Sequence, residues 1–118
     1  MTNARKVRGM ATQAMIAADL REEGIYPFAT DAGAGRPGAD ILNTPGISCE
    51  VKARTNFDPV AALRQATKNA AEGETPIVVV RMNGQGEAKI NDWVAFMRWE
   101  DMKEFIKWKS GVKNVNAS

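Results

Sequence analysis

The residues best suited to chemistry lie in two short segments near the middle of the chain, residues 38–42 and 48–52. Glu50 and Lys52 are two positions apart, so on a β-strand their side chains project from the same face. If the two segments pair as strands across the turn between them, Asp40 lies beside Glu50. Two neighbouring carboxylates repel each other unless a cation lies between them. The pattern therefore predicts a catalytic site built on Asp40, Glu50 and Lys52.

The residue types available to such a site favour a hard metal ion. The chain has no histidine and one cysteine, Cys49, which excludes His-based triads, Cys-rich zinc sites and an internal disulfide. Oxygen ligands suit Mg²⁺, with Mn²⁺ as a substitute. We expect Asp40, Glu50 and the backbone carbonyl of Val51 to be metal ligands, and Lys52 to polarise the attacking water or neutralise a phosphate.

A structural explanation of the same residues stays open. Glu50 and Lys52 could form an ion pair on a solvated strand, and Asp40 could be a turn acid after Gly38.

The elements that would position these residues make an α/β layered domain. The chain of 118 residues suits a single domain, residues 1–118. The predicted elements, in order, are a helix at 4–23, strands at 25–30, 40–42 and 48–52, a helix at 58–72, a strand at 77–81, a turn at 83–86, short strands at 87–90 and 94–99, and a helix at 100–108.

Two helix ends and two helix faces can be predicted in more detail. Gly24 is placed to stop the first helix, and Asp58 followed by proline is placed to start the second. Periodicity predicts inward-facing residues in the first helix (Met10, Ala14, Ala17 and Leu20) and in the second (Val60, Leu63, Ala66 or Thr67, and Ala70).

Composition sets limits on location and partners. The longest apolar run, residues 77–80, is too short to span a bilayer, so we expect no membrane association and a cytoplasmic location. A net charge of +2 does not by itself identify a nucleic-acid binder. Its distribution suggests phosphate contacts in a basic N-terminal arm and near the central motif, although such an arm could also be a solvated terminus. The predicted DNA-binding residues are Arg5, Lys6, Arg8, Arg36 and Arg54.

Five segments in order resemble the small phage and archaeal Holliday-junction resolvases, which are PD-(D/E)xK nucleases of the restriction-endonuclease-like superfamily. They are residues 9–24, 33–41, 50–54, 63–66 and 76–81. The resemblance implies a restriction-endonuclease-like αβββαβ core, a mixed central sheet flanked by helices, with a C-terminal β-hairpin and helix. It also implies a Mg²⁺-dependent endodeoxyribonuclease that cuts four-way DNA junctions in recombination and repair, as a homodimer, in the host cytoplasm if phage-encoded.

Two glutamines are added to the catalytic set through this resemblance. Gln13 stands where such resolvases commonly carry a glutamate, which favours one-metal chemistry. Because it lies on the inward stripe of the first helix, we expect it to be hydrogen-bonded, to a metal-bound water, to Lys52 or to backbone. Gln65 matches a glutamine that orients the metal water or touches phosphate, and it is otherwise an ordinary surface glutamine.

Two alternative functions remain open. The chain could be another nuclease of this superfamily, of the replication-repair or restriction type. It could be a DNA-binding module whose catalytic site has decayed through the change at Gln13.

The aromatic residues in the last quarter of the chain are expected to pack in the core, and the alternative is that they form a dimer interface. They are Trp93, Phe96, Trp99, Phe105 and Trp108.

Overall fold

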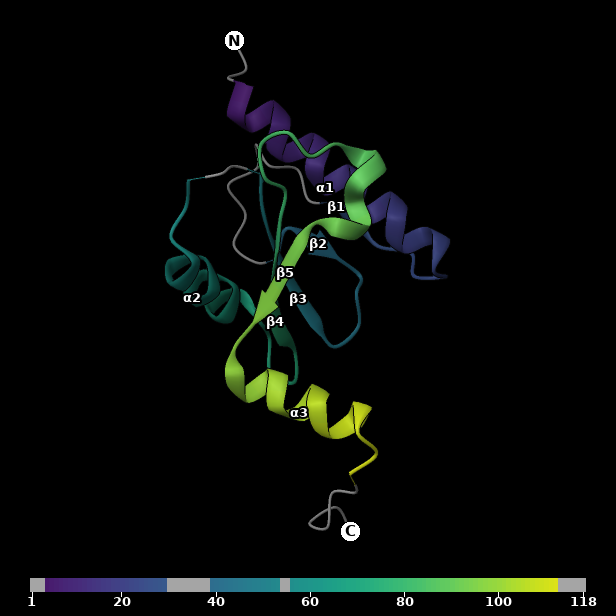
Figure 1. Ribbon diagram of the computed structural model, residues 1–118, viewed down its shortest axis with the longest axis vertical. Helices are drawn as coiled ribbons and strands as arrows, with labels where there is room; N and C mark the ends of the chain where they lie inside the picture. The colour runs from purple at the N-terminus through teal and green to yellow at the C-terminus, as the bar shows by residue number, and fades with distance from the viewer. Residues whose placement is uncertain (1–3, 30–38, 54–55, 113–118) are drawn as a thin grey trace.

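The computed structural model describes residues 4–29, 39–53 and 56–112, and of residues 4–6 and 28–29 the backbone alone. The elements in chain order are α1 (Ala4–Glu22), β1 (Phe28–Ala29), β2 (Ile41–Leu42), β3 (Ile47–Lys52), α2 (Pro59–Asn69), β4 (Thr75–Val80), the 3₁₀ helix η1 (Glu87–Asp92), β5 (Val94–Met97) and α3 (Trp99–Lys109). Figure 1 shows their arrangement, with α1 and α3 at opposite ends of the long axis.

The strands form one mixed sheet in the order β1-β2-β3-β4-β5. β3 and β4 run parallel, joined through α2, and every other neighbouring pair is antiparallel. The predicted α/β class with a mixed sheet and flanking helices is therefore confirmed. The finer assignment to a restriction-endonuclease-like core stays a prediction.

Helices α1 and α2 cover opposite faces of the sheet. On one face, Ile16 of α1 packs against Cys49 and Val51 of β3. On the other, Ala62 and Ala66 of α2 pack against alternate residues of β4, Val78 and Val80. Because Glu50 is paired with Val78 and Lys52 with Val80, the side chains of Glu50 and Lys52 lie on the α2 face.

Local signals position these helices as expected. Asp58 Oδ1 accepts hydrogen bonds from the amides of Val60 and Ala61 at 3.0 and 3.3 Å, which caps α2. Gly24 adopts a positive φ of 85° after α1, and the amide of Ile25 donates back to the carbonyl of Leu20. Both predicted helix boundaries are therefore confirmed by the geometry of their caps.

The strand predicted at 87–90 is wrong, because these residues belong to η1. The amide of Lys89 donates to the carbonyl of Gly86, and Trp93 Nε1 donates to the same carbonyl, which folds the segment into a tight turn. β4 pairs directly with β5, with Val80 opposite Val94. The C-terminal hairpin therefore has β4 and β5 as its strands.

The predicted inward faces of the helices were partly wrong. Met10 and Ala14 are exposed, whereas Thr12 and Gln13 are buried together with Ala17. The buried Thr12 hydroxyl is satisfied, because it donates to the carbonyl of Arg8 and accepts from Arg81. The spacing of hydrophobic residues cannot predict these polar contacts. In α2, Val60 is exposed, because the small Ala62 and Ala66 form the face against the sheet.

The late aromatic residues divide into two groups. Trp93 is buried, and the ring of Phe96 stacks on Phe57 with centroids 6.5 Å apart, as expected for core residues. Core packing was the wrong prediction for Trp99, Phe105 and Trp108, which are all exposed. They lie on α3, which extends beyond the sheet (Figure 1).

Across the described residues, no helix is both long enough and apolar enough to cross a membrane.

Candidate active site

The carboxylate of Asp40 is held at the point where the ladder between β2 and β3 ends. The amide of Asp40 donates to the carbonyl of Cys49 at 2.9 Å, which continues the ladder by one residue. Beyond this point the amide of Val51 donates to Asp40 Oδ2 at 2.7 Å. A side-chain oxygen thus takes the place of a strand carbonyl, and this fixes the Asp40 carboxylate above β3.

Asp40 and Glu50 lie side by side, as the spacing predicted, close enough for each carboxyl group to shift the pKa of the other. Burial, followed by the charge of Asp40, raises the pKa of Glu50 from 4.5 to about 7. Burial also raises the pKa of Asp40, while the Val51 amide and the charge of Lys52 act against that rise. The pair therefore holds a proton more readily than two exposed carboxylates would, unless a cation compensates its charge.

Lys52 links the carboxylate pair to α2. Its Nζ lies 3.5 Å from Glu50 Oε1, and it donates to Gln65 Oε1, also at 3.5 Å. Gln65, named from the sequence as a site residue, is therefore brought to the site by α2. The Glu50 side chain is 5% exposed and that of Lys52 17%, so the ion pair lies where screening by water is weak.

The donor set fits a hard divalent cation. Two carboxylates, from Asp40 and Glu50, lie next to one another, and Lys52 is the one positive charge among the described residues that acts on both. Among the described residues no three His, Cys, Asp or Glu side chains cluster, so a metal here would complete its shell with backbone oxygen, water or substrate phosphate. That is the usual way for proteins to bind Mg²⁺. Val51 lies between Glu50 and Lys52, and the role of its carbonyl as a ligand stays a prediction.

Gln13 is buried, as predicted, and its predicted bond to a metal-bound water stays a prediction. The residue is 6% exposed, and its Oε1 has no hydrogen-bond partner within the described part of the chain. A bond from Lys52 was the wrong expectation, since Lys52 Nζ lies beside Glu50 and Gln65. A buried acceptor that is left without any donor costs on the order of 1–3 kcal/mol, and no described residue donates to Gln13 Oε1.

Arg8 ties α1 to the carboxyl ends of the central strands. Its Nε donates to the carbonyl of Ala53 at 2.9 Å and its Nη2 to that of Met82 at 3.0 Å. Two of its nitrogens therefore bind backbone, and a phosphate contact would have to use its remaining N–H groups. The other predicted DNA-binding groups, the side chains of Arg5 and Lys6 and the whole of Arg36 and Arg54, lie outside the described residues.

Two further residues lie next to the site and were not singled out from the sequence. Ser48 is on the same face of β3 as Glu50, and its buried Oγ has no hydrogen-bond partner among the described residues. The amide of Arg81 donates to the carbonyl of Lys52 at 2.8 Å. The alternation of β3 could have indicated Ser48, because it lies two positions before Glu50. Arg81 could not be found this way, since its position depends on the pairing of β3 with β4.

Comparison of the chain with protein-family models, with curated proteins and with solved structures gave no match.

Proposed function

We propose that the chain is a metal-dependent endodeoxyribonuclease of the PD-(D/E)xK type that hydrolyses phosphodiester bonds. The observation that carries the proposal is the adjacent pair of carboxyl groups, Glu50 buried and Asp40 half-buried, with Lys52 Nζ 3.5 Å from Glu50 Oε1. A purely structural ion pair needs one carboxylate. The second carboxylate raises the free energy of the metal-free site and is explained by a cation that binds both.

The residues of the site would divide the chemistry between them. A bound Mg²⁺ or Mn²⁺ would supply an activated water and charge stabilisation at the phosphate. Asp40 and Glu50 would hold the ion, Asp40 with its orientation set by the Val51 amide. Lys52 would donate to the phosphate or to the attacking water, and Gln65 would keep the ammonium group in position through its contact with Nζ.

Four-way junction DNA is the proposed substrate, on the basis of the sequence resemblance. A junction has two-fold symmetry and needs two opposed cuts, which suits two copies of the chain. A duplex- or flap-cutting nuclease of the same superfamily would use the same residues and differ only in the DNA it prefers.

The test is a nicking assay on a labelled four-way junction with duplex and flap controls, in Mg²⁺, in Mn²⁺ and in EDTA. We expect metal-dependent paired cuts by the wild-type protein, and loss of cleavage in Asp40→Asn and Glu50→Gln with the fold retained. Glu72→Gln, an exposed carboxylate in the turn after α2, is the matched control and should cut normally.

The outcomes separate the alternatives. Normal turnover by Glu50→Gln would remove the catalytic assignment. Equal cutting of junction, duplex and flap would remove the junction preference and leave the nuclease assignment intact. DNA binding without Mn²⁺ binding or cleavage in the wild-type protein would favour a DNA-binding module with a decayed site, in line with the neutral amide of Gln13, whose Oε1 has no hydrogen-bond partner among the described residues.

A further inference from the structure

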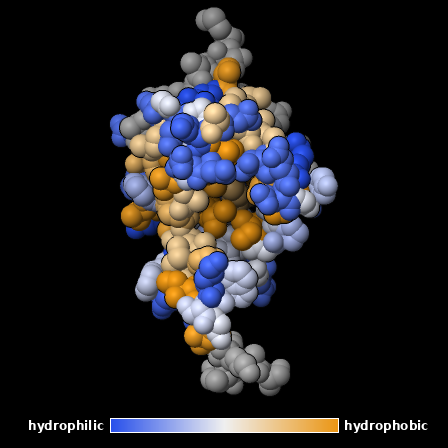
Figure 2. Space-filling model, turned by 45° about the vertical axis from the view of Figure 1, so that its right-hand side comes forward, coloured by the Kyte–Doolittle hydropathy of each residue, from blue (hydrophilic) through white to orange (hydrophobic). Residues whose placement is uncertain are grey.

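Helix α1 covers only part of its face of the sheet. Within the described residues it contacts β1 and β3 and makes at most marginal contact with β4 and β5. Ile77 and Val79 of β4 are therefore only half-buried, and Ala95 of β5 is exposed. The space between α1, this part of the sheet and η1 is a cavity of about 290 Å³, with Ile90 and Trp93 as its wall on the side of η1. Figure 2 shows hydrophobic side chains, in orange, on the floor of a hollow in the middle of the molecule.

The lining of this cavity is mostly apolar, and its neutral polar groups are already satisfied. The Thr44 hydroxyl donates to the carbonyl of Ile47 at 3.1 Å, and Trp93 Nε1 donates to the carbonyl of Gly86 at 3.3 Å. Burial raises the pKa of the Cys49 thiol to about 12, so this side chain lines the cavity as a neutral group. The walls are therefore held by internal hydrogen bonds, and the cavity needs no rearrangement to receive an apolar ligand.

Asp19 is the one charged residue among the described residues that line the cavity. It is half-buried, and no described cation forms an ion pair with it. The nearby guanidinium of Arg21 donates to the carbonyl of Pro27. Asp19 also lies in the last turn of α1, where the unpaired carbonyl groups of a helix add negative potential. The carboxylate therefore attracts a cation, while the rest of the lining favours a hydrocarbon.

We propose that this cavity binds a small apolar ammonium compound, with its hydrocarbon part against Ile77 and Val79 and its ammonium group at the Asp19 carboxylate. The volume sets the size of the occupant. A water-sized group takes roughly 30 Å³, so the cavity has room for about ten non-hydrogen atoms. That is the lower end of the range for ligand sites in proteins, about 300–1,000 Å³. The inference does not depend on the proposed nuclease activity.

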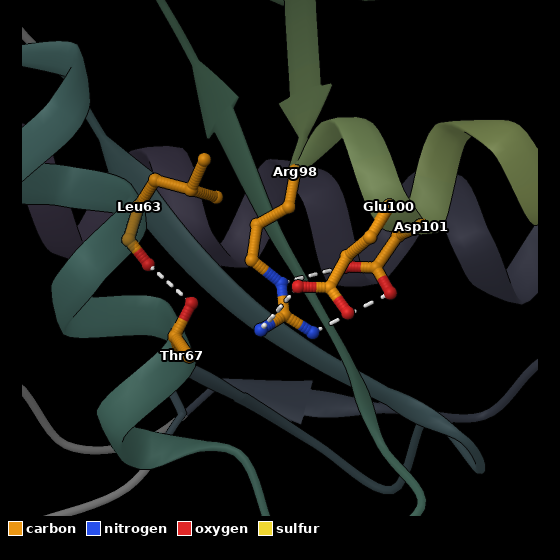
Figure 3. A network of polar contacts seen from close by, with 5 residues as sticks. All are labelled: Leu63, Thr67, Arg98, Glu100 and Asp101. Atoms are coloured by element: carbon orange, nitrogen blue, oxygen red, sulfur yellow. Dashed lines mark hydrogen bonds and ion pairs between the residues drawn. The ribbon is translucent and has the colours of Figure 1, made fainter.

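A second apolar groove, on the α2 face of the sheet, has the opposite charge and serves as an internal comparison. Its rim is basic; the basic residues are Arg64, Lys68 and Arg98. Figure 3 shows Leu63 and Arg98, which both line this groove, and the contacts of the Arg98 guanidinium with Glu100 and Asp101. A ligand that is drawn only to apolar surface would enter either site, whereas an ammonium ligand should avoid the basic groove.

The experiment titrates the full chain with three probes that share one hydrocarbon chain and differ in charge: octylammonium, octan-1-ol and octanoate. Isothermal titration calorimetry gives the affinities, and amide signals in two-dimensional NMR spectra give the location. The test variants are Asp19→Asn, which removes the charge, and Ala95→Leu, which adds bulk at an exposed position of the lining. The matched control is Asp92→Asn, which removes an exposed carboxylate of η1 outside the lining. Far-UV circular dichroism reports whether each variant is folded.

We expect the wild-type protein to bind octylammonium with a dissociation constant on the order of 0.1–1 mM, as suits a ligand of this size. Octan-1-ol should bind about threefold more weakly and octanoate about tenfold more weakly, because Asp19 attracts only the first probe and repels the last. Asp19→Asn should reduce these differences to about twofold or less, Asp92→Asn should leave them unchanged, and Ala95→Leu should weaken all binding at the cavity. Octylammonium should shift the amide signals of Ile77 and Val79.

Three results would overturn the proposal. The first is no binding of octylammonium up to about 10 mM, well above the expected dissociation constant. The second is the same preference for octylammonium in Asp19→Asn as in the wild-type protein. The third is a shift of the Leu63 and Thr67 signals in place of those of Ile77 and Val79, because it would place octylammonium in the α2 groove.

Discussion

Replacing Glu50 with glutamine is expected to stabilise the metal-free protein at pH 8 and to remove most of the pH dependence of its stability. Burial and the neighbouring Asp40 raise the pKa of Glu50 from 4.5 to about 7. Between these two values the folded state holds a proton that the unfolded state has released. The free energy of unfolding therefore falls as the pH rises through this window. Above pH 7 the wild-type protein carries the full penalty of a buried, ionised Glu50.

The magnitude follows from the same pKa. One pKa unit corresponds to about 1.4 kcal/mol, so the rise from 4.5 to about 7 lowers the free energy of unfolding by roughly 3 kcal/mol. The Glu50 side chain is 5% exposed, so water screens little of this effect. Asp40, whose pKa is also raised, acts in the same direction. Glutamine has nearly the shape of glutamate and no charge, so it avoids the penalty on the order of 2–3 kcal/mol at pH 8.

Urea unfolding in EDTA at pH 5, 6, 7 and 8 measures this directly, with wild-type protein, Glu50→Gln and the surface control Glu72→Gln. We expect stability to fall from pH 5 to pH 8 in the wild type and in the control, and to change little in Glu50→Gln. Added Mn²⁺ should restore the wild-type stability at pH 8 through binding to the folded state, and should have little effect on Glu50→Gln. Equal pH slopes in wild type and Glu50→Gln would refute the reasoning, because the buried pair would then not control the titration.

Three further changes test other parts of the structure. Lys52→Ala should abolish cleavage yet leave Mn²⁺ affinity intact, measured by isothermal titration calorimetry; a matching loss of metal affinity would contradict its assigned role. Asp58→Ala should lower the free energy of unfolding by about 1 kcal/mol, because it removes the α2 cap, and an unchanged urea midpoint would argue against that cap. Gln13→Met should raise stability by about 1 kcal/mol, because it removes a buried acceptor, Oε1, that has no partner among the described residues; a large fall in stability would mean that the amide has a partner in solution.

The site was largely predictable because its key relationships are local in the chain. Glu50 and Lys52 share a strand face through a spacing of two, and Asp40 reaches them across a turn in which Asn43 and Gly46 adopt positive φ. Asp58 and Gly24 mark helix ends through chemistry within a few residues. The contact between Gln65 and Lys52 was harder to predict, because it depends on where along β3 the helix α2 packs.

The sequence by itself determined where most helices and strands begin and end, and it predicted that Asp40, Glu50 and Lys52 lie together where the β2–β3 ladder ends. The tertiary structure alone decided the roles of the residues whose partners are distant in the chain. Arg8 binds carbonyls 45 and 74 positions away, and Thr12 is buried because Arg81 is 69 positions away. The tertiary structure also decided the form of residues 87–90. The sequence pattern predicted a strand there, but the segment belongs to η1 because β4 pairs directly with β5. The exposure of the α3 aromatics also follows from tertiary structure, because periodicity specifies which side chains share a face but not whether another surface covers that face.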